Sequence, residues 1–309
     1  MGFTWEKITL MGQEGIQITG YEGALSDLLL PDVLEELPVR SIAAHAFSGR
    51  DELRSVRLGR NLKMLRPFAF YNCTALRTME LCSTTDDCYD GVIRQCPSLR
   101  RITVHMIQPD NYVLLRSLLQ DVDSTLTFRL LFDEPLTEGG GNELRLTFPE
   151  YVNEAREDTM ARAIHFSIEG AGMAYRECVG KRQLDLNGYD RLLDRLTEYD
   201  FAVAVRIALD RLQYPVGLSE QAEKGYESFL RENAEGVLEI LIHEDREDSR
   251  AAELQLLTRR RLPDDKALEH GLQLAAQEGR TGLCGILMEY RRTRQGTNGT
   301  AGAGLQLEW

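Results

Sequence analysis

The sequence lacks an apolar run long enough to cross a membrane and an apolar leader at its start. A membrane-spanning helix needs about 20 consecutive, mostly apolar residues, whereas the opening stretch MGFTWEKITL already carries Glu6 and Lys7. Gly2 follows Met1, but Glu6 stands where a myristoylation signal needs serine or threonine. We therefore expect a cytoplasmic protein with no membrane partner.

An excess of positive charge is also missing. The 309 residues include 36 lysines and arginines against 49 aspartates and glutamates, which gives a net charge of −13. A protein that attracts nucleic acid or anionic lipid through its overall field needs the opposite sign. We therefore expect no nucleic-acid partner, and we interpret the acidic surface as an aid to solubility.

Cysteine and histidine are too few and too scattered to suggest a metal site. The six cysteines form no C-x-x-C pair, and none of the five histidines lies four residues from another, although zinc sites normally show such spacings. Asp86, Asp87 and Asp90 lack the glycine and glutamate of a calcium loop, so a solvated loop before the third sequence repeat explains them better. The G-A-G run at 170–172 lacks a third glycine and a lysine–serine pair, which favours a turn between strands over a phosphate loop. The sequence predicts no metal and no cofactor.

Residue types used in catalysis do not occur at spacings that bring them together. A nucleophile needs a base within hydrogen-bond reach, and no local pattern places one there. We therefore expect no catalytic residues and no enzyme activity. The alternative is an enzyme of unknown class with its site in the segment 149–187. Ring-bearing residues gather in and beside that segment: Phe148, Tyr151, His165, Phe166 and Tyr175.

The sequence does contain one pattern written three times in its first third. The copies are AHAFSGRDELRSVRL, RPFAFYNCTALRTMEL and YDGVIRQCPSLRRITV, and they end 23 residues apart, at Leu58, Leu81 and Val104. Apolar residues recur in the same columns, so each copy predicts a turn or short helix followed by a short strand. One such coil cannot bury its apolar side alone, and successive coils therefore stack into a parallel ladder.

The repeat has the form A-F-x-x-C-x-x-L-x-x-hydrophobic-x-L, and its most regular copy is FYNCTALRTMEL at 70–81. Over residues 16–104 this pattern resembles the leucine-rich repeats of the bacterial surface-antigen (BspA-like) type. Arg50 replaces the cysteine in the first copy, and Ile93 replaces the phenylalanine in the third. The resemblance implies a solenoid with a recognition role and brings no catalytic residues with it. In the cysteine column we expect buried, reduced thiols at 73 and 96.

Further signals lie on both sides of the repeats. FTWEKITL and GIQITGY alternate apolar and polar residues and predict a hairpin over the first coil. PDNYVLLRSLLQDV predicts a helix and STLTFRLLF a strand, which together would form a fourth, eroded unit. The glycine-rich run TEGGGN at 137–142 predicts a flexible break, and ELRLTF predicts a last strand of the solenoid.

Beyond the middle of the chain, the apolar residues change to a helical period. DFAVAVRIALDRLQYP has one apolar face, with Asp200 placed to cap its start. Ser219 is placed to cap the next helix, and Pro263 fits the first turn of a later one. HGLQLAAQEGRTGLCGILMEY is similar to one ankyrin repeat, although the usual T-P-L-H opening is absent.

These signals predict an α+β repeat protein. We expect an N-terminal leucine-rich-repeat solenoid with a 23-residue period, followed by an α-helical, ankyrin-like domain. The four predicted segments are the solenoid with its cap at 1–148, a connector at 149–187, the helical domain at 188–294 and a disordered tail at 295–309.

Arginine follows the first leucine of every copy, at Arg54, Arg77 and Arg100. Stacking should place the three in one column with neighbours about 4.8 Å apart, and like charges that close are normally disfavoured. One explanation is that nearby acids neutralise the column; these are Asp51, Glu52 and Glu80. The other is a site for an acidic peptide, which uses arginine's fork of N–H donors. The candidate partner-binding residues are Arg54, Arg57, Arg77, Arg100 and Arg101.

The function that these features favour is a non-catalytic interaction module or scaffold. It would bind a protein or an acidic peptide through the surface of the solenoid, because stacked repeats offer extended surfaces of this kind. A further hypothesis is a structural protein that self-associates through the edges of the solenoid.

Overall fold

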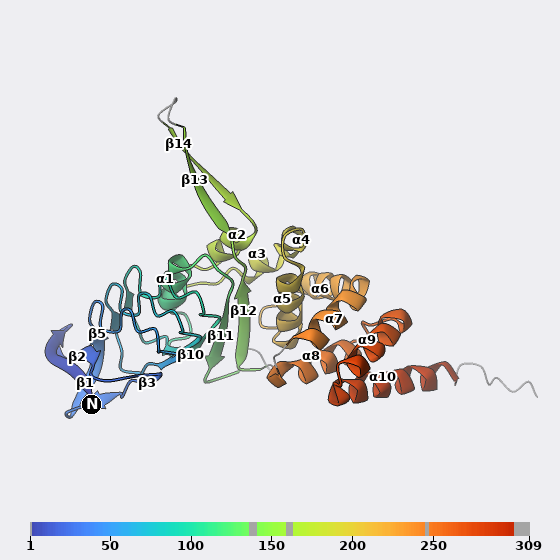
Figure 1. Cartoon of the computed structure of the whole chain (residues 1–309), viewed down its shortest axis with the longest axis horizontal. Helices are drawn as coiled ribbons and strands as arrows, with labels where there is room; N and C mark the ends of the chain where they lie inside the picture. The colour runs from blue at the N-terminus through green and yellow to red at the C-terminus, as the bar shows by residue number, and fades with distance from the viewer. Residues whose placement is uncertain (1, 136–140, 159–162, 245–246, 300–309) are drawn as a thin grey trace, which may run out of the picture. The chain divides into compact units, whose positions relative to one another are not determined.

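The computed structural model describes residues 2–135, 141–158, 163–244 and 247–299 (Figure 1). Contacts divide the chain into two compact units. Unit 1 contains Met1–Val203 and Tyr214–Leu218, and unit 2 contains Ala204–Gln213 and Ser219–Trp309. In the described residues, the named strands all belong to unit 1. No described helix is long and apolar enough to span a bilayer.

The N-terminal cap of unit 1 is an antiparallel hairpin of β1 (Phe3–Leu10) and β2 (Gln13–Tyr21), as the alternating pattern predicts. Ile16 and Ile18 of β2 are fully buried, because they cover the open apolar end of the first coil. β2 then pairs in parallel with β5 (Leu37–Ile42). β4 (Val33–Leu34) pairs antiparallel with the first two residues of β5. The hairpin therefore begins the back of the solenoid.

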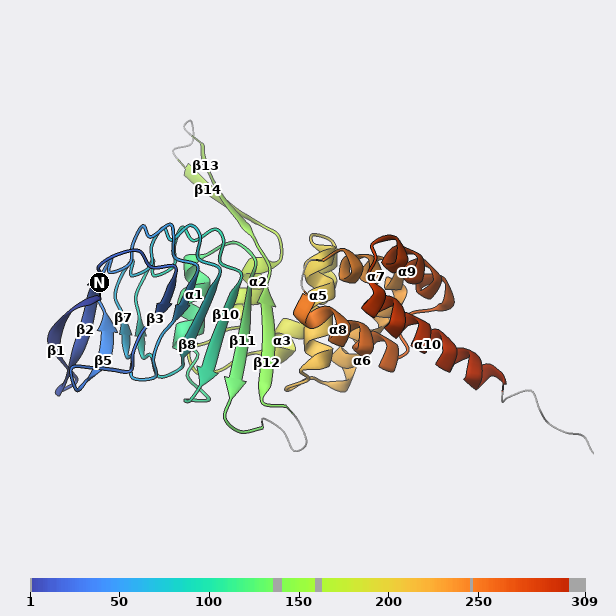
Figure 2. The same ribbon diagram turned by 60° about the horizontal axis from the view of Figure 1, so that its bottom comes forward.

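The coils stack into two ladders that enclose the core between them (Figure 2). The back ladder continues from β5 to β7 (Met64–Leu65) and β9 (Asp87–Cys88). The front ladder contains β3 (Asp27–Leu29), β6 (Ser55–Arg57), β8 (Thr78–Cys82), β10 (Arg101–Met106) and β11 (Leu126–Phe132), all parallel. Val56 lies beside Met79 and Met79 beside Ile102, which confirms the solenoid and its period of 23 residues.

Columns of the same residue type fill the space between the ladders. The rings of Phe47 and Phe70 stack with their centroids 5.2 Å apart, and both are buried. The Sγ of Cys73 donates a hydrogen bond to the Phe47 carbonyl at 3.2 Å, and Cys96 donates to the Phe70 carbonyl at 3.2 Å. Both thiols are free and buried, as expected. Each coil is thereby bonded to the coil before it through its interior.

Arg50 takes the cysteine's place in the first coil. Its guanidinium donates hydrogen bonds to the carbonyl oxygens of Tyr21 and Gly23, the second at 2.8 Å, and it pairs with Glu52 at 3.1 Å. Tyr21 is the last residue of β2, and Gly23 lies just after it. The substitution therefore keeps the link to the preceding turn of the chain, with a longer side chain that reaches the cap.

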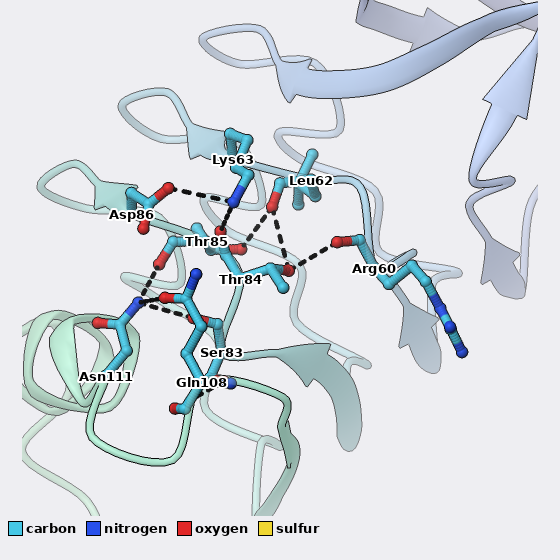
Figure 3. A network of polar contacts seen from close by, with 9 residues as sticks. All are labelled: Arg60, Leu62, Lys63, Ser83, Thr84, Thr85, Asp86, Gln108 and Asn111. Atoms are coloured by element: carbon cyan, nitrogen blue, oxygen red, sulfur yellow. Dashed lines mark hydrogen bonds and ion pairs between the residues drawn. The ribbon is translucent and has the colours of Figure 1, made fainter.

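Polar side chains connect the turns of successive coils (Figure 3). Lys63 pairs with Asp86 at 3.3 Å and donates to the carbonyl of Thr84 at 3.0 Å, in the next coil. Asn111 is buried and donates to the carbonyl of Ser83 at 2.7 Å. These bonds satisfy carbonyl groups of the turns, which lie outside the two ladders. They hold the turns of successive coils in register, as the ladder hydrogen bonds hold the strands.

A helical unit closes the repeats, as predicted. Its elements are α1 (Val113–Asp121) and β11, and β12 (Glu143–Phe148) then runs antiparallel to β11. The Asp121 carboxylate accepts hydrogen bonds from the backbone N–H groups of Gly91 at 2.7 Å and Ile93 at 3.1 Å. Burial raises the pKa of this carboxyl group. Asp121 therefore ties the closing helix to the third coil.

The predicted connector at 149–187 contains a hairpin, one short helix and the start of a second, and a third short helix follows it; all of them belong to unit 1. The elements are β13 (Val152–Asp158), β14 (Ala163–Glu169), α2 (Gly172–Glu177), α3 (Leu186–Asp190) and α4 (Leu193–Thr197). The hairpin projects from the solenoid as an arm (Figures 1 and 2). The hydroxyl of Tyr189, in α3, donates to the carbonyl of Thr147 at 2.6 Å and accepts from its N–H at 3.0 Å.

Two glycines shape the segment after the hairpin. Gly170 has a φ of +92°, which favours glycine, and a Cβ on Gly172 would meet the Pro149 carbonyl oxygen at 2.2 Å. We expected a turn between strands here, and that was wrong, because the turn leads from β14 into α2. The glycines allow two stretches of backbone to approach closely.

Unit 2 is a stack of helices, which confirms the helical half of the prediction. Its elements are most of α5 (Phe201–Gln213), α6 (Glu220–Glu232), α7 (Ala234–His243), α8 (Glu247–Arg259), α9 (Asp265–Gln277) and α10 (Thr281–Gly299). α9 packs between α7 and α10, and α8 contacts both α7 and α10. The ankyrin-like character of this stack stays a prediction.

The helix caps agree with the sequence in two cases of three. Asp200 and Ser219 accept hydrogen bonds from backbone N–H groups three residues later, at 3.0 and 3.2 Å, as predicted. Pro263 was expected in the first turn of α9, and that was wrong. The cap is Asp264, which accepts from the N–H of Ala267 at 2.8 Å. An aspartate side chain can satisfy a free amide of the first turn, and proline cannot.

Two predicted segments fall partly outside the described residues. α10 continues to Gly299, so a helix covers 295–299 of the segment that we expected to be disordered, and 300–309 lie outside the description. Most of the predicted glycine-rich break, 137–140, also lies outside it.

Candidate interaction surface

The front ladder leaves one face of its sheet open, and the register arranges the outward residues in rows. One row contains Asp27, Ser55, Thr78, Arg101 and Thr127, and the next contains Leu29, Arg57, Glu80, Thr103, Arg129 and Arg145. Residues alternate between the two faces of a strand, so these rows face away from the buried columns. The first row mixes hydroxyl and charged residues and the second adds an apolar one, Leu29, whereas the columns inside repeat apolar residues.

A depression of about 370 Å³ lies on this face over β3, β6, β8 and β10. At one side it is lined by Leu29, whose side chain is 64% exposed. Ser55 and Thr78 lie in the same row as Arg101, so two short hydroxyl side chains separate the guanidinium from β3. The depression therefore offers an apolar side chain, hydroxyl groups and a cation within one hollow.

The three column arginines lie one above another, at the point where each front strand begins. The N–H of Arg77 donates to the carbonyl of Arg54 at 2.9 Å, and the N–H of Arg100 donates to the carbonyl of Arg77 at 3.1 Å. All three residues are exposed. The side chain of Arg100 bends back and donates to the carbonyls of Pro97 at 2.6 Å and Leu99 at 3.0 Å.

Three of the five predicted site arginines have neither an ion pair nor a side-chain hydrogen bond in the described part of the chain. Among the described residues, the side chains of Arg54, Arg77 and Arg101 make no hydrogen bond and no ion pair. Arg57 differs, because it is held by Glu80 at 2.9 Å. The structure thus places Arg57 and Arg101 in the outward rows of the sheet and the three column arginines just before its strands begin. Among the described residues it leaves the guanidinium groups of Arg54, Arg77 and Arg101 without a partner.

Two of the three acids considered as neutralisers, Glu52 and Glu80, are engaged elsewhere. Glu80 accepts from Arg57 and also contacts the Nε2 of His105 at 2.8 Å. Glu52 pairs with Arg50. In the part of the chain that the structure describes, none of the three acids forms an ion pair with the column. Neutralisation through contact is therefore not the arrangement seen at this edge.

Asp27 is an acid whose charge interacts with Arg54 of the column without forming an ion pair. Its carboxylate accepts hydrogen bonds from Ser55 at 2.5 Å and from Ser26 at 2.7 Å. The pKa of Asp27 is lowered by the hydrogen bonds from Ser55 and Ser26 and, to a smaller extent, by the charge of Arg54. The carboxylate is therefore already bonded to hydroxyl groups at the rim of the depression.

The other end of the sheet contains a closed ionic cluster that the sequence analysis did not predict. Glu143 accepts two hydrogen bonds from Arg129, both at 2.8 Å, and one from Arg145 at 2.6 Å. Arg145 also lies over the ring of Tyr214, 4.5 Å from its centroid. Burial raises the pKa of Glu143, but the hydrogen bonds from the two arginines outweigh it and leave the pKa below its usual value. The repeat pattern could not reveal this cluster, because it depends on the antiparallel pairing of β12 with β11.

The ring-bearing residues beside the connector fill a core. Tyr189 packs edge to face against Phe148, with centroids 5.9 Å apart, and against Tyr175, with centroids 4.7 Å apart. All three rings are buried, and burial raises the pKa of the Tyr175 hydroxyl. The side chains of His165 and Phe166 lie outside the described ones. These three rings therefore have a packing role. Tyr151 differs, because its ring lies under the guanidinium of Arg176, 4.8 Å from the centroid, and lines a hollow of about 470 Å³ beside the third coil.

The acidic segment at 86–90 is part of a coil. Asp87 belongs to β9, which pairs in parallel with β7, and Asp86 pairs with Lys63. The predicted inserted loop was therefore wrong, because these residues supply the back strand of the third coil. Among the described residues, no three histidine, cysteine or acidic side chains gather in a group that could hold a metal ion.

Comparison with known proteins agrees with this architecture. Residues 28–123 match the family model of the BspA type leucine rich repeat region, in six copies. The range begins in β3 and ends just after α1, so it includes the irregular units on both sides of the three regular copies.

Two solved structures are similar to part of the chain. One is a leucine-rich repeat protein from Bacteroides ovatus ATCC 8483, with 16% identity over 34% of this chain and 30% of that chain and a TM-score of 0.27. The other is the T. pallidum leucine rich repeat protein, with 19% identity over 32% of this chain and 68% of that chain and a TM-score of 0.18. The match thus spans less than a third of the first of these proteins. A search of curated proteins found no match. From the stacked ladders, the period and the matching model, residues 28–123 of this chain are a leucine-rich repeat region of the BspA type.

Proposed function

We propose that this protein is a non-catalytic interaction module whose front sheet face binds an acidic segment of a protein partner. The observation that carries the proposal is the set of three exposed arginines, Arg54, Arg77 and Arg101, that have no ion pair in the described residues. Arg101 lines a hollow of about 370 Å³ on this face, and Arg54 and Arg77 directly precede Ser55 and Thr78, which line it too. Unpaired guanidinium groups are expected to bind carboxylates, because their N–H donors match carboxylate geometry.

The surroundings favour a peptide segment as the ligand. Thr78 offers a hydroxyl group beside Arg101, and Leu29 offers apolar surface at the rim. A segment with an acidic residue and an apolar residue a few positions apart would satisfy both ends of the hollow. The rest of the protein is acidic, with a net charge of −13. An acidic partner would therefore be steered to this face and repelled from most others.

The fold supports an interaction role without identifying the partner. Stacked repeats present an extended, rigid surface, and proteins of this architecture commonly use it for binding. The leucine-rich repeat match over 28–123 includes the strands that line the hollow up to β10. Function rests on the site and not on the fold alone, so the arginines are the residues to test.

The experiment is selection of a random peptide library on the purified full chain. We expect the selected peptides to be rich in aspartate and glutamate. Their affinity should fall at high salt, because charges on an exposed surface are screened beyond about 8–10 Å. Replacing the acidic residues of a selected peptide with glutamine or asparagine should abolish binding. Selected peptides without acidic residues, or binding that is indifferent to salt, would contradict the proposal.

Matched variants separate this face from general charge effects. Arg77→Gln combined with Arg101→Gln should weaken the selected peptides at least tenfold. Arg292→Gln provides the control, because Arg292 is a highly exposed arginine (79% of its side chain) in α10 of unit 2. It removes one positive charge far from the sheet face in sequence and should leave binding unchanged. Equal effects of the two replacements would show that the binding is non-specific.

A further inference from the structure

We propose that the hollow beside the third coil is a binding site for a neutral sugar. Its volume of about 470 Å³ lies within the range of about 300–1,000 Å³ that is typical of small-molecule sites. It is lined by residues 94–97 of the third coil, by residues 120–124 at the end of α1 and by Tyr151. None of these residues belongs to the rows of the front sheet face, so this inference does not depend on the proposed function.

Several side chains at the hollow have hydrogen-bonding groups that the protein does not use. Within the described part of the chain, no side-chain hydrogen bond is made by Gln95, Gln120, Asp123, Ser124 or Tyr151. The two amides both donate and accept, the carboxylate accepts, and the two hydroxyl groups can do either. A sugar presents neighbouring hydroxyl groups that each donate and accept. Its hydroxyl groups therefore match this mixture of donors and acceptors.

The ring of Tyr151 gives the hollow an apolar surface in a fixed position. The guanidinium of Arg176 lies over this ring, and the Tyr151 N–H donates to the Asp123 carbonyl at 3.1 Å. An aromatic ring carries partial negative charge on its face, which attracts the weakly positive C–H groups of a sugar ring. A ligand with C–H groups and hydroxyl groups close together therefore suits an aromatic ring and polar side chains in one hollow.

The charges around the hollow balance one another, which favours a neutral ligand over an ion. Arg176 is buried without an ion pair in the described part of the chain, and burial lowers its pKa to about 10. The charge of Asp123 acts on this guanidinium. Arg94 forms an ion pair within its own coil, and the Asp121 carboxylate is bonded to two backbone N–H groups. An ionic ligand would therefore meet a compensating charge of its own sign.

The walls of the hollow are held in place by bonds within the protein. Arg176 donates hydrogen bonds to the carbonyls of Val122 at 3.3 Å and Ser124 at 2.9 Å. In the third coil, the carbonyl of Arg94 accepts from the N–H of Asn72 at 3.0 Å. A site that is formed in advance binds its ligand at a smaller cost in entropy. Arg176 is thus a positioning residue, which acts through the segment that it holds.

The first test is titration of the full chain with glucose, galactose, mannose and N-acetylglucosamine, followed by ligand-observed NMR and calorimetry. At least one of the four should bind with a Kd in the millimolar range or below. Its affinity should not change with salt, because the ligand has no charge to screen. The methyl glycoside of that sugar distinguishes two sources: equal binding indicates a sugar at the end of a glycan, and weaker binding indicates a free sugar. No binding of any of the four, or an affinity that falls with salt, would overturn the proposal.

Matched variants locate the binding in the hollow. Gln120→Ala combined with Asp123→Ala should weaken sugar binding about tenfold, because it removes two hydrogen-bonding groups, one of them charged. Both side chains are exposed and make no bond in the described part of the chain, so the fold should be unchanged. Gln273→Ala combined with Asp133→Ala is the control, because these residues are also exposed and do not line the hollow. Equal affinities of the two double variants would refute the site.

The role of the aromatic ring can be tested separately. Tyr151→Ala should abolish sugar binding, whereas Tyr151→Phe keeps the ring and should retain most of it. A loss in Tyr151→Phe as large as in Tyr151→Ala would contradict the proposed contact with the ring. Arg77→Gln combined with Arg101→Gln should bind the sugar normally, which keeps this result separate from the peptide-binding result. A sugar affinity that falls in this variant would place the site on the front face and overturn the proposal.

Discussion

The inside and the outside of the coils follow opposite rules. Inside, one residue type recurs from coil to coil, as in the stacked rings of Phe47 and Phe70 and the thiols of Cys73 and Cys96. Outside, the positions in one row differ from coil to coil, as in the row that contains Ser55, Thr78 and Arg101. The difference has a physical reason. Apolar groups gain by stacking on their own kind, whereas stacked charges repel one another.

The arginine column is the exception to this comparison. Arginine recurs at one exposed position of three successive coils. Such recurrence of one residue type is otherwise a feature of the buried columns. In the described residues, an ion pair compensates none of the three, although Arg100 bonds to its own turn. The closed cluster around Glu143 shows the usual solution, in which two arginines share one acid. Under the proposed function, the acid that pairs with this repeated charge belongs to the partner.

The largest effect should come from the inside. Replacing Phe70 with alanine removes a ring that is fully buried and stacked on Phe47, and it should lower the free energy of unfolding by about 3–5 kcal/mol. Phe47→Ala should cost less, because it lies nearer the N-terminal cap, where the structure can relax. Chemical denaturation of both variants provides the measurement. Losses below about 1 kcal/mol in both would contradict the stacked column.

A smaller effect is expected at the closed cluster. Glu143→Gln leaves two arginines without their charged acceptor at a side chain that is 13% exposed, and it should cost about 1–3 kcal/mol in the same measurement. Glu134→Gln is the control, because Glu134 is exposed and lies in the loop before β12. Equal stability of the two variants would mean that the cluster adds nothing to the fold.

Acid should reduce the contribution of this cluster. The folded pKa of Glu143 lies below the unfolded one, so the carboxylate stabilises the folded state above about pH 4.3, and this stabilisation is lost as the pH falls through the folded pKa. The difference in unfolding free energy between the unmodified chain and Glu143→Gln should therefore shrink with acid. Denaturant titrations at several pH values test the sign, and a difference that grows in acid would refute it.

The smallest effect on stability should come from the arginine column. Replacing Arg54, Arg77 and Arg100 with glutamine removes the repulsion and keeps much of the aliphatic stem, so stability should stay within about 0.5 kcal/mol or rise slightly. Arg100 is the member with bonds to its own turn, so Arg77→Gln alone should be the more neutral single change. A loss of about 1 kcal/mol or more in the free energy of unfolding at each site would show that the arginines stabilise the fold, as the buried columns do.

Repetition explains why most of the solenoid could be predicted. A residue such as Val56 recurs as Met79 and Ile102 at a fixed spacing, and the same spacing sets which backbone groups meet. One regular copy therefore predicts its neighbours. The same argument placed the arginine column, because its members occupy one position of the repeat.

What the sequence did not reveal depends on contacts made once. The cluster around Glu143 arises because β12 turns back beside β11, whereas the other described strands of the front ladder are parallel. The arm of β13 and β14 has two strands of ordinary length in a stretch that carries no repeat signal, so it was assigned to a connector. The cap of α9 was assigned to Pro263 because a proline is a familiar start signal, although Asp264 beside it has the side chain that satisfies the first turn.

The bond between Tyr189 and Thr147 has a consequence for how the chain is made. One hydroxyl group occupies both the N–H and the C=O that Thr147 turns away from β11, yet it lies 42 residues further along the chain. During synthesis, the last strand of the solenoid therefore leaves the ribosome well before the residue that covers its outer edge. A chain truncated after residue 149 would keep that edge open to other nascent chains. The outer edge of the solenoid is thus covered only after Tyr189 has been synthesised. Fragments that end between 149 and 189 should therefore aggregate most readily.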